Sequence, residues 1–191
     1  MQGLLWHGRK SRMKSRVVFL SESDEWATPQ DFFDNLNAEF HFTTDVACTP
    51  QNSLCAHSIF SALDTDWSDD GDYSRAVCFM NPPYSQCRAF MAKATEESHK
   101  GATVVCLVPS RTDTQWWHKF VWNQATHQFR PGVEGRFVKG RWKFGGAKQG
   151  APFPSVVVIF RPTPSTHFPS QSRSIPVVVL PQGNPQSARE S

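Results

Sequence analysis

The sequence predicts an α/β fold, in which a mostly parallel sheet with an antiparallel edge carries helices on both faces. Short apolar segments alternate with segments of helical periodicity along the chain, a pattern typical of parallel βαβ units. The segment 102–108 is apolar throughout, as expected for a strand that is covered on both faces. The last two apolar segments lie close together, so an antiparallel pair should complete the sheet.

Each element follows from its local pattern. Thr28 and Pro29 suit the N-cap and the first position of a helix, because threonine can cap free N–H groups and proline has none to cap. Apolar residues then recur at helical spacing as far as Phe40. Further helices are expected at 87–99, closed by Gly101, and at 114–126. Strands are expected at 42–46, 76–80, 102–108, 137–144 and 156–160.

The 191 residues suit one domain with an extension at each end. Residues 1–24 read as a basic, flexible N-terminal segment, residues 25–161 as the domain, and residues 162–191 as a tail rich in Pro, Ser and Gln. Within that tail, the apolar run 175–180 could either add a strand to the sheet edge or stay exposed. The sequence leaves open whether Met1 or Met13 is the true start.

The cysteine pattern argues against a metal centre and against a disulfide framework. Cys55 and His57 are close together, but two candidate ligands are a weak metal signal. No apolar stretch is long enough for a signal peptide or a membrane span. We therefore expect a cytoplasmic protein with no metal and no membrane contact. The cysteines are odd in number and none has C-x-x-C spacing: Cys48, Cys55, Cys78, Cys87 and Cys106.

Charge is distributed unevenly, although the net charge is only +3. Residues 1–21 carry five bases and no acid, and residues 22–113 carry fifteen acids and five bases. Residues 119–161 then carry eight bases and one acid. Such asymmetry indicates that one side of the molecule meets a polyanion, with a solvated basic face as the alternative.

The motif Asn81-Pro82-Pro83-Tyr84 directly follows the apolar segment 76–80, at the strand end where open α/β sheets bind ligands. Its prolines stiffen the turn and remove two N–H donors, so the Asn81 side-chain oxygen and the Pro82 carbonyl can both accept hydrogen bonds from one NH2 group. Two such acceptors favour a pyramidal nitrogen whose lone pair can attack. Tyr84 offers a flat face on which a planar base can stack. A purely structural turn is the alternative.

This motif resembles the catalytic motif of amino-methyltransferases that use S-adenosylmethionine and act on adenine N6, cytosine N4 or the glutamine side-chain amide. Over residues 25–161 the chain resembles the phage and prophage Dam-type DNA N6-adenine methyltransferases. Several motifs in one order are more specific than any of them alone. The similar stretches are 25–29 (EWATP), 44–52 (TDVACTPQN), 62–67 (ALDTDW), 81–85 (NPPYS), 108–117 (VPSRTDTQWW) and 140–144 (GRWKF).

The resemblance implies a Rossmann-like methyltransferase sheet and assigns roles within it. Catalysis would belong to Asn81, Pro82, Pro83 and Tyr84. The cofactor-binding residues that it implies are Trp26, Thr28, Pro29, Asp45, Asn52 and Asp64. The first three belong to a segment that covers the cofactor, the next two to the loop after the first strand, and the last is an acid that contacts the adenosine part.

The chain also departs from the usual methyltransferase pattern. The glycine-rich loop is missing after Asp45, where Val-Ala-Cys-Thr-Pro follows instead. Asp45 and Asp64 could each cap a turn, and Trp26 could be a core aromatic. Because no large target-recognition domain is inserted, we expect modest sequence specificity.

Bases alternate with aromatic residues and glycines over 130–148, which suits a nucleic-acid backbone and unstacked bases. An ordinary solvated strand face is the alternative. Alternation places Arg136 on the face opposite Phe137, while Arg111 follows a strand end and could meet phosphate or the cofactor carboxylate. The residues expected to contact DNA are Arg111, Arg136, Lys139, Arg141 and Lys143.

The sequence thus predicts methyl transfer from S-adenosylmethionine to adenine N6 in duplex DNA, with the target base flipped out of the helix. A cytosine N4 or a protein glutamine methyltransferase is an alternative, although the basic segment argues against the latter. A phage DNA-binding protein that has lost catalysis is a rival from another class, kept open by the altered cofactor loop. The sequence does not reveal the recognition site, the oligomeric state or any protein partner.

Overall fold

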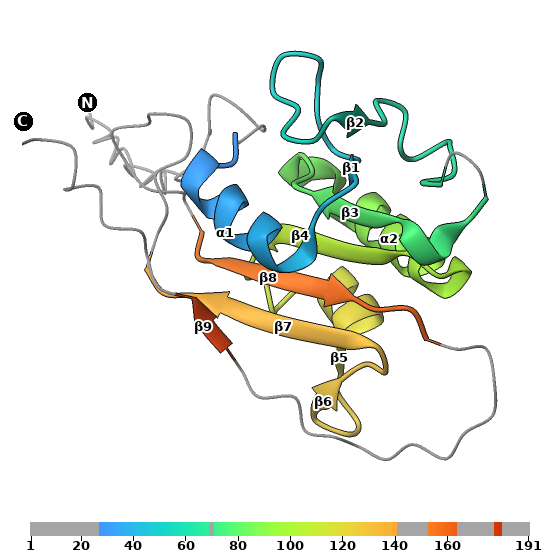
Figure 1. The fold of residues 1–191 in the computed structure, drawn as a ribbon. Helices are drawn as coiled ribbons and strands as arrows, with labels where there is room; N and C mark the ends of the chain where they lie inside the picture. Colours follow the sequence, from blue (N-terminus) through green and yellow to red (C-terminus); the bar gives the residue numbers. More distant parts are fainter. Residues whose placement is uncertain (1–26, 69–70, 141–152, 164–177, 181–191) are drawn as a thin grey trace, which may run out of the picture.

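The computed structural model describes residues 27–68, 71–140, 153–163 and 178–180. Within these residues, seven strands form one sheet in the order β2-β1-β3-β4-β8-β7-β9 (Figure 1). Strand β8 pairs antiparallel with β4 and with β7, whereas the other neighbours pair in parallel, which confirms the expected fold class. The strands are β1 (Thr44–Asp45), β2 (His57–Ser58), β3 (Val77–Met80), β4 (Thr103–Pro109), β7 (Val133–Val138), β8 (Ser155–Phe160) and β9 (Val178–Leu180).

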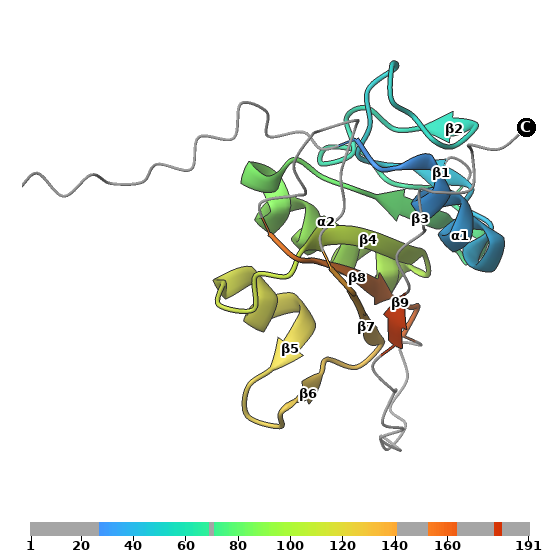
Figure 2. The same ribbon diagram turned by 90° about the vertical axis from the view of Figure 1, so that its left-hand side faces the viewer.

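Different helices cover the two faces of the sheet (Figures 1 and 2). Helix α1 (Gln30–Phe40) packs on one face through its apolar stripe, and helix α2 (Cys87–Lys100) covers the other. Strand side chains alternate between the two layers, as the pleat requires. Phe79 of β3 packs in the cluster under α1, whereas Cys78 and Met80 pack in the cluster under α2.

Helix α1 begins one residue later than the sequence predicts. Pro29 occupies its N-cap with an extended backbone (φ −60°, ψ 137°), and no side chain caps this end. The expected cap by Thr28 is wrong, because the Thr28 hydroxyl instead accepts a hydrogen bond from Asn81 at the end of β3.

The helix predicted at 114–126 is wrong in its second half. A short π-helix, η3 (Trp117–Val121), leads into a hairpin of β5 (Trp122–Asn123) and β6 (Gln128–Phe129). The side chain of Asn123 accepts two backbone N–H hydrogen bonds in the turn, which is how asparagine favours a turn over a continuing helix.

The last strands also differ from their predicted bounds. The strand expected at 137–144 begins earlier, as β7 at Val133, and residues 141–144 lie outside the described part, as does the predicted N-terminal segment 1–24. Strand β9 pairs with β7 at the sheet edge, so the edge-strand alternative is confirmed for residues 178–180, and this part of the predicted tail contributes to the sheet. Among the described helices, none is long and apolar enough to cross a membrane.

Candidate active site

The strand order reverses beside β1, and a pocket lies at that point. The chain leaves β1 for β2 on one side and later returns to β3 on the other, so the carboxyl ends of β1 and β3 flank the reversal. Open α/β sheets bind their ligands at such switch points. The pocket is lined by residues of the α1 entry, the loop after β1, the segment after β2 and the turn after β3, including Thr28, Asp45, Asn52, Phe60, Asn81 and Pro83.

The predicted catalytic motif forms the turn that leaves β3. Strand β3 ends at Met80, and Asn81 and the buried Pro82 follow directly. Tyr84 then begins a 3-10 turn, η2 (Tyr84–Gln86), which leads into α2. The half-buried Asn81 lines the pocket, and its Nδ2 donates a hydrogen bond to Thr28 Oγ1 at 2.8 Å.

Two further side chains extend this edge beyond Tyr84. The Tyr84 and Phe153 rings lie 6.4 Å apart between centroids, tilted by 53°. The Arg111 guanidinium lies 5.1 Å from the centroid of the Phe153 ring, and it also pairs with the exposed Asp113. The antiparallel pairing of β4 with β8 explains the arrangement, because it sets the residues after β4 beside those before β8. Sequence analysis missed Phe153, whose one signal is an aromatic just before an apolar strand.

Asp45 shapes the wall of the pocket from the end of β1. It is only 3% exposed, and its two carboxylate oxygens accept hydrogen bonds from the N–H groups of Ala47 (3.2 Å) and Leu54 (3.1 Å). Burial raises the pKa of this carboxyl, and the two backbone hydrogen bonds oppose that rise. Asp45 therefore caps the loop that follows it and lines the pocket as well.

Asn52 fixes the far side of the same loop. Its Oδ1 accepts hydrogen bonds from the N–H (2.6 Å) and the hydroxyl (3.1 Å) of Thr49, and it also lines the pocket. Side-chain acceptors thus hold this loop in place, although it contains no glycine between residues 46 and 55. The glycine-rich loop that the sequence lacks after Asp45 is thus replaced by a loop held by the Asp45 and Asn52 side chains.

Phe60 is a pocket residue that the sequence analysis missed. Its side chain is 59% exposed, two residues after β2, at the rim of the pocket. By contrast, Asp64 is exposed in the following turn and is not among the residues that line the pocket. Pro29 lies at the start of α1 away from the lining, and Trp26 lies outside the described residues.

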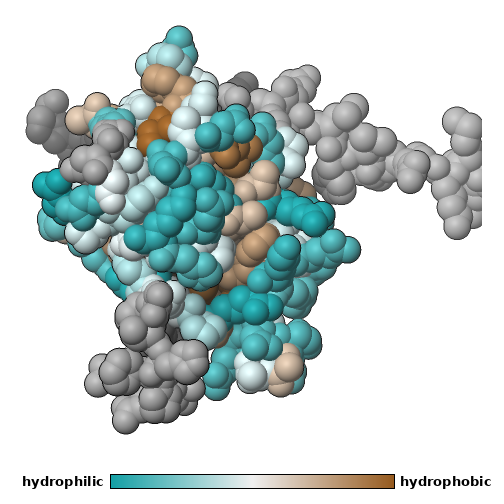
Figure 3. All heavy atoms as spheres, turned by 90° about the vertical axis from the view of Figure 1, so that its right-hand side faces the viewer, coloured by the Kyte–Doolittle hydropathy of each residue, from teal (hydrophilic) through white to brown (hydrophobic). Residues whose placement is uncertain are grey.

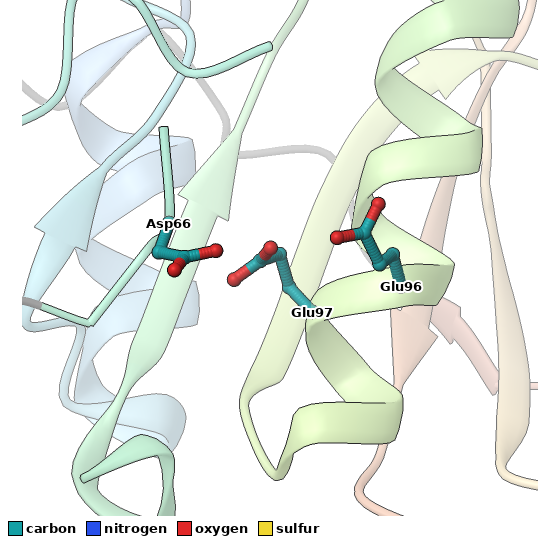
Figure 4. A group of neighbouring side chains, drawn as sticks. All are labelled: Asp66, Glu96 and Glu97. Atoms are coloured by element: carbon teal, nitrogen blue, oxygen red, sulfur yellow. The ribbon is translucent and has the colours of Figure 1, made fainter. Parts of the chain in front are cut away.

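An acidic cluster near the end of α2 has the ligand types of a cation site (Figure 4). Asp66 approaches from the loop before β3, and Glu96 and the fully buried Glu97 approach from α2. Two ammonium groups already pair with these carboxylates: Lys100 lies 2.6 Å from Asp66 and 2.9 Å from Glu97, and Lys93 lies 2.8 Å from Glu97.

The cluster has a structural role, because it joins two segments of the chain. Burial lowers the pKa of Lys100, but hydrogen bonds to Asp66, Glu97 and Glu96 outweigh this and leave it well above its ordinary value. The second oxygen of Glu97 accepts the N–H of the buried Trp67 at 3.0 Å. These contacts fasten the loop before β3 to α2.

The structure separates the five bases that were expected to contact DNA. Arg136 is buried, and its guanidinium pairs with Glu134 (2.6 Å) and on both its other nitrogens with Glu39 (2.6 and 2.7 Å). All three guanidinium nitrogens donate to these carboxylates inside the protein, which favours a structural role over the expected DNA contact. Lys139 is exposed, whereas Arg141 and Lys143 lie outside the described residues.

The direction of β7 decides which bases share an edge with Asn81. Strand β7 runs in the same direction as β3. Strands β4 and β7 both pair antiparallel with β8, and β3 pairs in parallel with β4. Lys139 follows the carboxyl end of β7 and so lies at the edge of Asn81, roughly 14 Å across three strand spacings. Arg130 precedes β7 and belongs to the opposite edge.

That opposite edge has a hollow of its own. Arg130, Lys119 and His99 line it together with Val133 and Phe160. Figure 3 shows this side of the molecule, where hydrophilic residues cover most of the surface and hydrophobic ones reach it in a narrow strip. Within the described part of the basic segment, Arg130 and Lys139 therefore lie at opposite edges of the sheet.

Comparison with known protein families gives one match. A family model described as DNA N-6-adenine-methyltransferase (Dam) matches residues 15–180. A comparison with curated proteins finds no match.

Proposed function

Because the chain belongs to the Dam family of DNA N-6-adenine-methyltransferases, we propose that it transfers a methyl group from S-adenosylmethionine to the N6 amine of adenine in DNA. The observation that carries this proposal is the position of Asn81 and Pro82. Both follow the carboxyl end of β3, and Asn81 lines the pocket at the point where the strand order reverses.

The pocket suits S-adenosylmethionine, which when bound supplies a methyl group activated on a positively charged sulfur. No lysine or arginine is among the described residues that line the pocket, so a cation entering it meets no like charge. The exposed ring of Phe60 offers a face for the adenine part, and the Asn52 and Thr49 side chains offer polar contacts. Asp45 keeps the loop between them in shape.

In this proposal the motif after β3 holds the substrate amine. The Asn81 side-chain oxygen and the Pro82 carbonyl would accept hydrogen bonds from its two N–H groups and direct the nitrogen lone pair at the methyl group. The new N–C bond would replace the bond of that methyl group to sulfur, and one N–H proton would pass to solvent. Tyr84 and Phe153 provide ring faces for an extrahelical adenine. Since the reacting methyl group is already activated, the residues contribute mainly orientation and hydrogen bonding.

Duplex DNA would reach the site with the target base flipped out, at a cost of a few kcal/mol. Arg111 and Lys139 follow the carboxyl ends of β4 and β7, on the same side of the sheet as Asn81, and would contact phosphates, together with Arg141 and Lys143. Arg136 is left out of this set, because it is committed to Glu39 and Glu134. We place the activity with the DNA in the cytoplasm, with modest sequence specificity.

Transfer to purified acceptors tests the proposal. The protein is incubated with labelled S-adenosylmethionine and, separately, with a mixed-sequence duplex, a duplex of G·C pairs alone, and total cellular protein. Label is expected on adenine of the mixed duplex alone. Label on G·C duplex would identify a cytosine N4 enzyme, label on protein a glutamine enzyme, and cofactor binding without transfer an inactive relative; each result would replace the proposal.

The bases that follow β7 in the sequence should set the salt dependence of DNA binding. Replacing Lys139, Arg141 and Lys143 together by Gln should reduce the log–log slope of affinity against salt by about 0.9 for each phosphate that is no longer neutralised. Lys119→Gln is the control, since Lys119 is exposed at the opposite edge and should leave the slope unchanged. Fluorescence anisotropy on one duplex gives both slopes. Equal slopes for the triple variant and the unchanged protein would show that these bases are only a solvated face.

A further inference from the structure

Thr28 and Asn81 are far apart in sequence but share a direct hydrogen bond. Asn81 Nδ2 donates to Thr28 Oγ1 at 2.8 Å, in a partly buried position. Both residues line the pocket, Thr28 from the segment that enters α1 and Asn81 from the end of β3.

The two residues are held in one packed unit. The Phe33 and Phe79 rings meet edge to face, 5.1 Å apart between centroids, and join α1 to β3. Thr28 stands just before the N-cap Pro29, whose fixed φ restricts the residue before it. Asn81 follows Phe79 by two residues, so the same aromatic contact positions both partners.

An asparagine side chain ends in two groups of opposite character. Its oxygen accepts hydrogen bonds and its NH2 group donates two. A half-turn about the last side-chain bond exchanges them in nearly the same volume. With the NH2 group toward the substrate, donors would face the hydrogens of the amine, and the acceptor needed for the reaction would point away.

We propose that Thr28 is a positioning residue that selects the productive orientation of the Asn81 amide. By accepting from Nδ2, its hydroxyl fixes the NH2 end toward the segment before α1. In the proposed complex the oxygen, on the other branch of the amide, then faces the substrate amine. The inference rests on the proposed function, in which the Asn81 oxygen accepts from the adenine amine. It gives Thr28 a role in the catalytic geometry in place of the cofactor-covering role that family resemblance implies.

The decisive variant is Thr28→Val, which has the shape of threonine but cannot accept the hydrogen bond. The rate of methyl transfer in a single turnover should fall about tenfold, the size expected for one hydrogen bond between neutral groups. Cofactor affinity measured by calorimetry should change by less than about twofold. Thr28→Ser restores the hydroxyl and should recover most of the rate. Thr126→Val, in the exposed turn after β5, is the matched control and should leave the rate unchanged.

A double-mutant cycle with Asn81→Asp isolates the role in orientation. Both oxygens of a carboxylate are acceptors, so the aspartate has no orientation to select. Adding Thr28→Val to Asn81→Asp should therefore cost about twofold or less, against about tenfold in the Asn81 protein. Equal losses in both backgrounds would overturn the inference. So would a Thr28→Val effect confined to cofactor affinity, or no effect at all.

A measurement without methyl transfer separates this inference from the proposed function. In the free protein, the Asn81 side-chain NH2 protons should exchange with water several-fold more slowly in the unchanged protein and in Thr28→Ser than in Thr28→Val, as NMR of the ¹⁵N-labelled amide can record. Unchanged exchange in Thr28→Val would contradict the positioning role, whatever the substrate proves to be. If exchange is slower in the unchanged protein than in Thr28→Val but the protein methylates no DNA, the Thr28–Asn81 contact stands and only the proposed function is rejected.

Discussion

Asn81→Ala is expected to slow methyl transfer by about 100- to 1000-fold while cofactor and DNA bind nearly as before. The Asn81 oxygen is asked to accept a hydrogen bond that strengthens as the amine becomes pyramidal, so it acts mainly in the transition state. Losing one preorganised partner of this kind costs about that much in rate. The Pro82 carbonyl remains, but one acceptor cannot hold both hydrogens. Single-turnover rates measure the loss of methyl transfer. Calorimetry with the cofactor and anisotropy with DNA measure whether binding is kept.

Asn81→Asp serves as the matched variant, because it keeps an acceptor at nearly the same place. It should retain measurable transfer where the alanine variant shows almost none. A near-normal rate for Asn81→Ala would mean that the turn after β3 is structural and that catalysis has been assigned to the wrong residues.

The second large effect concerns folding. Arg136→Met should lower the free energy of unfolding by about 3–5 kcal/mol, the usual result of removing one partner from a buried ion pair. Arg136 joins Glu134 on its own strand to Glu39 on α1, and its guanidinium lies 5.3 Å from the centroid of the Phe40 ring. The variant would leave the buried Glu134 carboxylate with the single contact to Arg161 among the ion pairs described. Urea unfolding at pH 7 measures the change.

The same substitution at Arg111 is the control, since its ion pair with Asp113 is exposed and worth at most about 1 kcal/mol. The pH dependence gives a second check. The hydrogen bond from Arg136 lowers the pKa of Glu39 below its ordinary value of 4.5. The stability from this pair is therefore present above pH 4.5 and is lost as the pH falls through the lowered pKa. The difference in free energy of unfolding between the unchanged protein and Arg136→Met should therefore become smaller in acid. A difference in free energy of unfolding below about 1 kcal/mol at pH 7 would contradict the structural role of Arg136.

The turn that we propose to be catalytic could be located from the sequence because its information is local. Four consecutive residues follow an apolar strand, and the sheet rule places a ligand at that strand end. The alternation of strands and helices likewise predicted the two-sided sheet. The loop after β1 was flagged as unusual, and the caps by Asp45 and Asn52 show how it keeps its shape without glycine.

The remaining features depend on partners that are remote in sequence. Arg136 belongs to a basic segment by composition, but its guanidinium binds Glu39 on a helix that is distant in sequence. Thr28 reads as a helix cap, because nothing local reveals that Asn81 will lie beside it. Phe60 and Phe153 follow no periodicity, and each gains meaning only when the pocket edge is assembled around it. The segment after Thr114 has helical spacing, yet the turn at Asn123 redirects it into a hairpin.

The central claim is that this chain methylates adenine N6 in DNA through Asn81, and nucleoside mass spectrometry of cellular DNA tests it most directly. DNA is prepared from methylation-deficient cells that express the unchanged protein or Asn81→Ala at equal soluble levels. The account predicts N6-methyladenine with the unchanged protein and a level at or near background with Asn81→Ala. N4-methylcytosine in its place, no modified base from soluble protein, or equal N6-methyladenine from both proteins would contradict it.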